Sequence, residues 1–453
     1  MPEQLIRTVD QVDFQANSLD KLIAKWPYRY SVDPSVPGLL LLVNCADELL
    51  VASRMSKKNW SAGCLAVLAL LLWTERAEAQ ELKIADHAID FHGWYSQGFA
   101  YSSGNNYLTM DTTAGSFALR DGGINASTSL RDNLRIGAQV SAYQIGQLGG
   151  PHPRLDWALL DYQAKRWLGI RAGQVKTKLG LYSDTQDMEM LQTFALLPAA
   201  LYPRDTMAST LAHRGADIYG EIAPGKIGRI AYTIYVGKYV EDPYDGNHFA
   251  SDSPMSVFGT QRGADIRWYT PVRGLMVGAS YQLMNWTFWA QYPDGNRDWS
   301  ADVDPKAHLT NYFVRYSRGK WRWEAEIRRT VDVERTAYSS TASPQYADDI
   351  AEDYSDLGAY ASVTYQATRG LSLGGYFSGY RSDCSYDSTD NLIRDRAVTA
   401  KYEFGSHFYV KTEGHFFAGY GNDWALRGFY SEANPNGLVP KTKLLLIRAG
   451  FQF

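Results

Sequence analysis

The chain has 453 residues, of which 13% are aromatic, and a formal net charge of −4. A slightly acidic chain without a basic patch argues against nucleic acid as a partner. The mean hydropathy is −0.33, and no stretch reaches the roughly 18 apolar residues that a membrane-spanning helix needs, so a helical membrane protein is excluded. A membrane protein built from alternating strands is not excluded. The 31 tyrosines suit one, because tyrosine favours boundaries between dry and wet surroundings.

The segment from Met55 to Ala79 has the three parts of a secretory signal peptide. A basic start precedes an apolar run, and Ala77-Glu78-Ala79 forms a small-residue cleavage site. We therefore expect residues 55–79 to be removed on export and residues 80–453 to form the exported protein. Because signal peptides belong at the start of a chain, residues 1–54 are interpreted as translation from a start codon assigned too early. A real cytoplasmic extension is the alternative.

After residue 80 the chain alternates between tight turns and longer connections. Turn-forming residues separate alternating segments at 131–133, 166–169, 223–225, 271–274, 318–320, 368–370 and 405–406. Longer polar stretches lie at 241–256, 289–306, 337–355 and 421–441. Seven tight turns with a further strand at each end predict about 16 strands. The fold class expected is an all-β, antiparallel, up-and-down transmembrane barrel with short periplasmic turns and long extracellular loops.

The stretch from Lys320 to Arg329 shows the strand pattern most clearly. Its apolar residues include Trp321, Trp323 and Ile327, and charged residues occupy the positions between them. In a barrel strand the tryptophans would face lipid and the charges would face an aqueous lumen. Taken alone, the stretch fits an edge strand of a soluble sheet equally well. The long series of hairpins favours the barrel, since a soluble sandwich does not normally need so many.

The longest connection runs from Tyr182 to Arg214, and it contains apolar residues, such as Phe194 and Leu201, that a free surface loop would avoid. Long loops without structure of their own are usually functional. A barrel of about 16 strands is too wide to be packed by side chains, so we expect this loop to fold inward and narrow the lumen. An outward-facing lid is the alternative. The charges expected at the constriction are Asp184, Asp187, Glu189, Arg204, Asp205 and Arg214.

Near this loop the sequence resembles a known family. The stretches 155–162, 173–181 and 196–198 look like the fourth strand, fifth strand and third-loop entrance of phosphate-selective porins of the O and P type. Lys178 stands where these relatives commonly carry proline, and no dense arginine ladder accompanies it. The resemblance implies an outer-membrane protein in contact with lipid and lipopolysaccharide, and porins of this size are often homotrimers. The chain ends on an alternating strand with Phe451 and Phe453, which resembles the assembly signal of porins; an ordinary strand ending in phenylalanine is the alternative.

Charges of both signs are expected on the lumen wall. Opposite charges across a water-filled section create a transverse field that favours polar solutes, or they merely satisfy one another. His415 is expected on the wall beside Glu413. The wall residues so assigned are Lys176, Lys178, Arg315, Arg322, Glu324, Glu326, Arg328, Lys411 and Glu413.

The sequence shows no grouping of nucleophile, base and carboxylate, and no CxxC, HExxH or phosphate-binding loop. We therefore expect neither an enzyme, nor a cofactor, nor a metal site. Two functions remain: a passive diffusion channel for small hydrophilic solutes or ions, and a surface receptor or adhesin that uses the barrel as an anchor. A charged lumen with one loop folded inside favours the channel, because a mere anchor has no use for it.

Overall fold

A computed structural model describes residues 80–84, 87–150, 152–246, 255–294, 297–303, 306–340, 348–383, 392–421 and 428–453. The predicted signal peptide and residues 1–54 lie outside the described residues. Among the described residues, no helix is long and apolar enough to cross a membrane.

The described chain consists almost entirely of strands. The first ten are β1 (Gln80–Ile84), β2 (His87–Ser103), β3 (Ser116–Arg131), β4 (Leu134–Ile145), β5 (Leu148–Gly149), β6 (Arg154–Lys165), β7 (Leu168–Lys176), β8 (Ala212–Ile222), β9 (Arg229–Tyr239) and β10 (Met255–Tyr269). The others are β11 (Leu275–Asp294), β12 (Arg297–Val303), β13 (Lys306–Arg318), β14 (Trp321–Ser340), β15 (Asp348–Gln366), β16 (Leu371–Ser382), β17 (Leu392–Phe404), β18 (Phe408–Ala418) and β19 (Lys441–Gln452). Three short helical turns are η1 (Glu189–Leu191), α4 (Met207–Thr210) and η2 (Gly225–Ile227).

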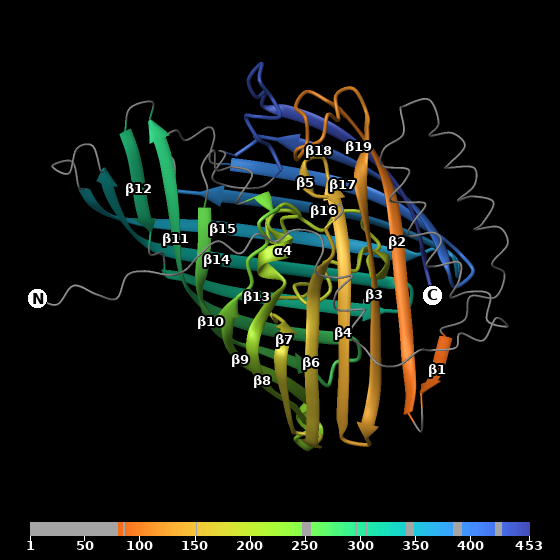
Figure 1. The fold of residues 1–453 in the computed structure, drawn as a ribbon. Helices are drawn as coiled ribbons and strands as arrows, with labels where there is room; N and C mark the ends of the chain where they lie inside the picture. The colour runs from red at the N-terminus through yellow and green to blue at the C-terminus, as the bar shows by residue number, and fades with distance from the viewer. Residues whose placement is uncertain are drawn as a thin grey trace, which may run out of the picture. The chain divides into compact units, whose positions relative to one another are not determined.

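Neighbouring strands are antiparallel and follow chain order, and the last strand closes the sheet on the first long one. In the described residues, β19 pairs with β2 from Lys443↔Ser103 to Gln452↔Trp94. The result is a closed barrel of 16 strands, to which β1, β5 and β12 are short additions (Figure 1). The predicted all-β, up-and-down transmembrane barrel is therefore confirmed.

All seven predicted tight turns are confirmed in the described chain, each between consecutive wall strands such as β3 and β4 or β17 and β18. Two of the predicted long polar loops were wrong. β11 continues to Asp294 and is followed by β12, and only residues 341–347 separate β14 from β15. In the sequence these strand ends contain turn-forming residues such as Pro293 and Ser339 and no regular alternation of apolar and polar residues, so they resemble a loop.

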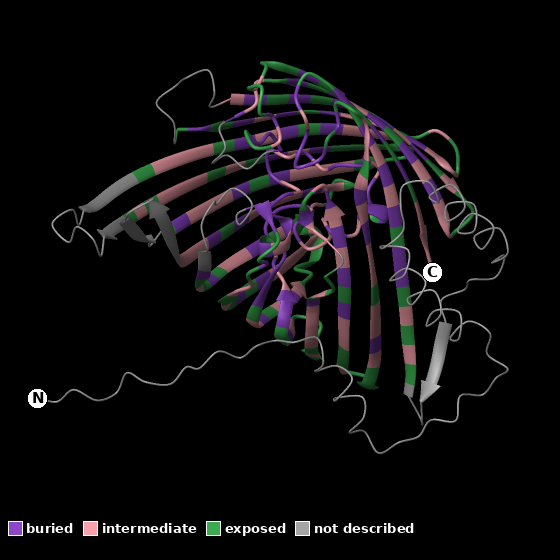
Figure 2. Cartoon of the chain, turned by 45° about the horizontal axis from the view of Figure 1, so that its top comes forward, coloured by how far each residue is buried: buried purple, intermediate pink, exposed green. Residues whose placement is uncertain are grey.

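The two faces of the wall differ in the way that the alternation predicts. On β14, Trp321, Trp323 and Ile327 are 45%, 40% and 44% exposed, whereas Glu324 and Glu326 are 4% and 3% exposed. Figure 2 shows the same alternation of buried and exposed residues along most strands. An apolar exposed face is the lipid-facing surface of a transmembrane barrel. The inner face of β14 therefore carries the charges.

Candidate functional site

The connection from β7 to β8, residues 177–211, is the third long connection of the wall, and we call it the third loop. It contains η1 and α4. The predicted bounds 182–214 were wrong, since β7 already ends at Lys176 and β8 begins at Ala212. The third loop therefore begins earlier in the chain and ends before Arg214.

The first part of the third loop is bound to the inner face of β10 to β14. The Gly180 N–H donates to Ser280 Oγ at 3.0 Å, and Arg267 Nη2 donates to the Gly180 carbonyl at 2.8 Å. Gly180 has a φ of +83°, and a Cβ here would overlap the side chains of Glu326 and Asn311. Only glycine tolerates both the backbone angle and the close approach.

Tyr202 holds the third loop to the same wall a second time. Its hydroxyl donates to Glu326 Oε2 at 2.7 Å and accepts the Tyr182 N–H at 3.1 Å. Arg328 Nη1 donates to the Leu201 carbonyl at 2.8 Å. Burial and the neighbouring Glu326 raise the pKa of Tyr202 well above its usual value, so the hydroxyl remains a donor at neutral pH.

β18 binds the middle of the third loop. Glu413 accepts the Ala195 N–H at 2.8 Å and the Leu196 N–H at 2.9 Å, one on each carboxylate oxygen. Lys411 Nζ lies 2.5 Å from Glu189 Oε1 and also donates to the Glu189 carbonyl at 2.8 Å. Hydrogen bonds to charged groups contribute about 1.5–3 kcal/mol each. Two wall side chains thus hold this stretch of the loop by four contacts, three of them to its backbone.

Further ion pairs attach the third loop beside β3 and β7. Asp187 lies 2.5 Å from Lys176, the last residue of β7. Arg204 forms an ion pair with Asp121 of β3, and Arg448 of β19 lies 2.9 Å from the same carboxylate. The third loop is therefore bound to wall strands on several sides of the barrel.

Two carboxyl groups of the third loop are held in the charged form. Burial by itself would raise the pKa of Asp184 and of Glu189, because desolvation disfavours a charge. Lys178 and Arg267, together with hydrogen bonds to the carboxylate, outweigh burial at Asp184, and Lys411 and Arg448 together do so at Glu189. Both pKa values therefore lie below their usual range. These ion pairs are therefore intact at neutral pH.

An apolar cluster lies beside the third loop. Ala195, Leu196 and Leu201 of the loop pack together with Tyr107, from the connection after β2, and Phe429, from the connection before β19. The wall contributes Leu119, Tyr143, Ile145, Tyr360, Tyr380, Ile393, Phe417, Leu444 and Leu446. Sequence analysis expected a lumen too wide to be packed by side chains. Here part of the section is packed, because three connections bring apolar side chains inward.

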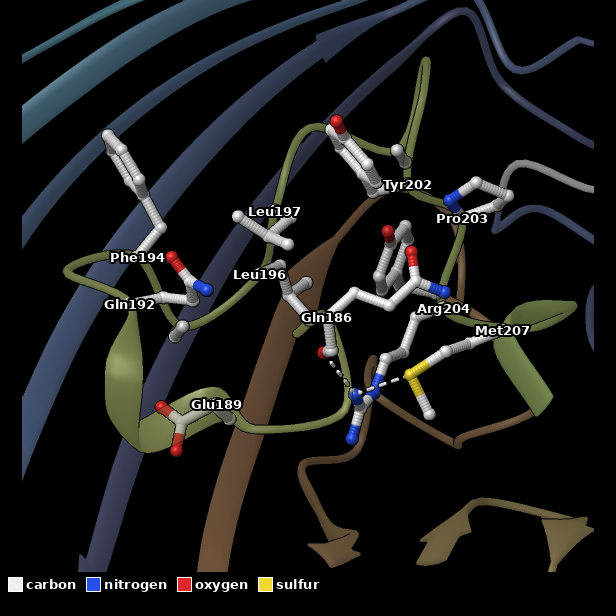
Figure 3. A pocket seen from close by; sticks show the side chains of 13 residues that line it. Gln186, Glu189, Gln192, Phe194, Leu196, Leu197, Tyr202, Pro203, Arg204 and Met207 are labelled. Carbon is white, nitrogen blue, oxygen red and sulfur yellow. Dashed lines mark hydrogen bonds between the residues drawn. The ribbon is translucent and has the colours of Figure 1, made fainter. Parts of the chain in front are cut away.

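The third loop lines most of a pocket, to which Tyr107 from the connection after β2 also contributes (Figure 3). It contains about 430 Å³ of space between atoms, part of it open to solvent. Arg204 Nη1 donates to the Gln186 carbonyl at 3.2 Å and to Met207 Sδ at 3.0 Å along one side. Phe194 and Tyr202 add aromatic surface elsewhere in the lining. The pocket is therefore a shallow recess of mixed polarity on the loop.

The predicted constriction residues divide into two groups. Asp184, Asp187, Glu189, Arg204 and Asp205 all lie in the third loop, and each has a charged or polar partner. Whether they border the narrowest section stays a prediction.

Arg214 was wrongly placed at the constriction. It lies in β8 and is exposed on the same face as Ile218, whereas His213 and Asp217 are fully buried on the inner face. Arg214 Nε donates to Gln174 Oε1 at 3.0 Å. Because β8 begins at Ala212, the alternation of the strand turns Arg214 outward.

Most predicted wall residues occupy wall strands. Lys178 is the exception, since it lies beyond the end of β7, in the third loop, where it forms an ion pair with Asp184. His415 Nε2 lies 2.9 Å from Glu413 Oε1, which confirms the predicted neighbours. Inward-facing positions are occupied by Arg315 of β13, Arg322, Glu324, Glu326 and Arg328 of β14, and Lys411 and Glu413 of β18.

Sequence reasoning missed several residues that hold the third loop, including Asp121, Tyr202, Arg267 and Arg448. Arg448 had a recognisable signal, because it is a charge on the inward-facing set of the last strand, between Leu446 and Gly450. Asp121 and Tyr202 had none, since their roles depend on partners far along the chain.

The C-terminal residues take part in closing the barrel. Phe453 and Gly93 exchange two backbone hydrogen bonds of 3.1 and 3.0 Å, and Phe451 pairs with Tyr95 of β2. Their role as an assembly signal stays a prediction.

No family model matches the chain, and no curated protein sequence matches it. Solved structures do. The outer membrane channel DcaP of Acinetobacter baumannii is 12% identical over 82% of this chain and 99% of its own, with a TM-score of 0.52. What the two share is the fold. OmpT, an outer membrane protein of Vibrio cholerae, is 13% identical over 83% of this chain and 100% of its own, at 0.48. The anion-selective porin from Comamonas acidovorans is 9% identical over 81% of this chain and 100% of its own, with a TM-score of 0.47.

Proposed function

We propose that the chain is an outer-membrane porin through which small hydrophilic solutes diffuse passively. The observation that carries the proposal is the third loop, which wall residues such as Glu413 and Glu326 bind from several sides of a closed barrel. A barrel that only anchors surface loops needs no such internal structure. The shared fold with an outer membrane channel supports the same function.

Within this function, the third loop sets the narrowest section of the channel. Its charges at Asp187, Glu189 and Arg204 are each paired with an opposite charge. Paired charges of opposite sign largely cancel at a distance, so size and polarity select solutes more than net charge does. For the same reason the proposal includes no preference for phosphate, despite the resemblance of the sequence to phosphate-selective porins.

The proposal includes export and placement. Residues 55–79 direct export and are removed, residues 80–453 insert into the outer membrane, and the long connections face outward among lipopolysaccharide. N-terminal sequencing of the membrane form should then begin at Gln80, and peptides from residues 1–54 recovered from cells would contradict the early-start interpretation. A homotrimer is the expected assembly, which cross-linking in intact membranes would measure.

Planar-bilayer recording of the purified protein tests the function directly. We expect discrete conductance steps. Replacing residues 186–204 by a short glycine-serine linker should enlarge the steps, because it removes most of the pocket lining. A matched variant shortened at 432–437, in the connection before β19, should change them less. A folded protein that gives no steps at all would refute the channel.

A further inference from the structure

The outer face of the barrel carries a compact group of cations near the ends of β17 and β19 that adjoin the long connections. Arg394, Arg396, Lys441 and Lys443 are all exposed there, and we call them the outer cation patch. Within the described parts of the chain, none of the four side chains makes a hydrogen bond or an ion pair. Four neighbouring like charges repel one another, and the described residues supply no anion that pairs with them.

Strand register arranges the patch as two short rows. Arg394 and Lys441 both pair with Ala418 of β18, and Arg396 and Lys443 both pair with Phe416. Strands lie about 4.8 Å apart and residues rise about 3.3 Å. The four Cα atoms therefore mark a rectangle of roughly 7 by 10 Å.

The patch borders the apolar outer face. Phe416 is half exposed between the two cations of one row, and Val398, Leu445 and Ile447 are exposed on the side toward the tight turns. Arg396 lies about eight residues before the end of β17 at the tight turn. At the usual rise per residue and a strand tilt of about 40°, this places Arg396 roughly 20 Å from that turn along the barrel axis. The apolar band of such barrels is about 25 Å tall. The cations thus lie at the level of lipid headgroups, with apolar surface beneath them for acyl chains.

From this arrangement we infer that the outer cation patch binds a membrane lipid whose headgroup carries phosphate, in the leaflet on the side of the long connections. A phosphate group carries about −1.5 to −2 charges at neutral pH, so four cations match a headgroup with two phosphates. The guanidinium groups of Arg394 and Arg396 suit bidentate phosphate contacts. In an outer membrane, the phosphorylated glycolipid of lipopolysaccharide has this chemistry. The inference rests on the proposed placement in the outer membrane, but it does not depend on what passes through the lumen.

The test compares lipid binding by the purified full-length protein in detergent, with diphosphorylated lipid A as probe and its dephosphorylated form as reference. The patch variant carries Arg394→Gln, Arg396→Gln, Lys441→Gln and Lys443→Gln. The matched control variant neutralises four exposed cations near the tight turns: Lys165→Gln, Lys226→Gln, Arg273→Gln and Arg369→Gln.

We expect the diphosphorylated lipid to bind the patch variant roughly tenfold or more weakly than the wild type, since each basic residue near an anionic lipid surface contributes appreciably to affinity. The control variant should bind within about twofold of the wild type, and the dephosphorylated lipid should not distinguish the three proteins. Equal losses in both variants, or none in the patch variant, would overturn the site. Displacement of the lipid by inorganic phosphate alone would assign the patch to a soluble anion, and a changed oligomeric state with unchanged lipid binding would assign it to contact between copies; either result would overturn the lipid. Conductance steps should be the same in all three proteins.

Discussion

Replacing Glu413 by glutamine should loosen the third loop at its attachment to β18. The two carboxylate oxygens accept the backbone N–H groups of Ala195 and Leu196 at 2.8 and 2.9 Å. Glutamine has nearly the same shape but only one oxygen, and its NH₂ group would face a second N–H donor. The variant therefore loses one charge-assisted hydrogen bond to the loop while the volume of the side chain is conserved. It also removes the negative charge that faces His415.

The lost bond is worth about 1.5–3 kcal/mol. Because 1.4 kcal/mol corresponds to a factor of ten, the ratio of attached to released loop should fall by roughly 10- to 150-fold. Single-channel recording measures this change. We expect more frequent short-lived transitions to a higher conductance, since a released loop no longer holds the middle of its chain against the wall.

Glu221→Gln is the matched control. Glu221 also accepts hydrogen bonds from charged partners, Arg166 and Arg229, but it lies at a tight turn away from the third loop. The control should leave single-channel transitions unchanged. If a correctly folded Glu413→Gln protein recorded like the wild type, β18 would not hold the pore-forming part of the loop, and the reasoning would be refuted.

Three further predictions concern the third loop. Gly180→Ala should lower the free energy of unfolding by more than about 1 kcal/mol, because the positive φ and the close approach to the wall exclude a Cβ. The unfolding temperature in detergent measures this change, and an unchanged temperature would show that the neighbouring wall side chains move to make room for the Cβ. Because the pKa values of Asp184 and Glu189 are lower in the folded protein than in the unfolded chain, the two ionised carboxylates stabilise the fold. This stabilisation is fully present above the pKa of about 4 that such groups have in the unfolded chain, and it is lost as the pH falls below that value. Current fluctuations should therefore be similar at pH 7 and pH 5 and increase toward pH 3, and an increase between pH 7 and pH 5 would contradict this assignment. Arg204→Gln should shift the reversal potential in a salt gradient toward cations, whereas Arg214→Gln, on the outer face, should not; equal shifts would place the constriction elsewhere.

The strand order could be predicted because the signals that specify it are local. Each tight turn contains residues suited to turn backbone angles, and each flanking strand shows a period of two. A closed barrel follows once these hairpins are counted. Where β11 continues to Asp294 and β14 continues to Ser340, the regular alternation in the sequence ended before the strand did.

The attachment of the third loop could not be predicted in the same way. Arg204 and Asp121 are 83 residues apart in the chain, and Ala195 and Glu413 are 218 apart. No local pattern links such partners. Arg214 shows a second limit: β8 begins at Ala212, three residues earlier than expected, so Arg214 belongs to the strand and its alternation, not to the loop.

The closure of the barrel has a consequence for the order in which the molecule is assembled. Arg448 and Ser96, which meet across the β19–β2 seam, are 352 residues apart, so this contact forms only after the last strand has been delivered. Until then β2 and β19 are unpaired edges, whose open backbone groups invite pairing with other chains. The anchors Lys411, Glu413 and Arg448 arrive with these late strands. The third loop is synthesised before the middle of the chain, but these contacts can hold it only after the C-terminal strands are in place. An incomplete barrel would therefore have an open wall, and its third loop would not yet be attached to β18 and β19.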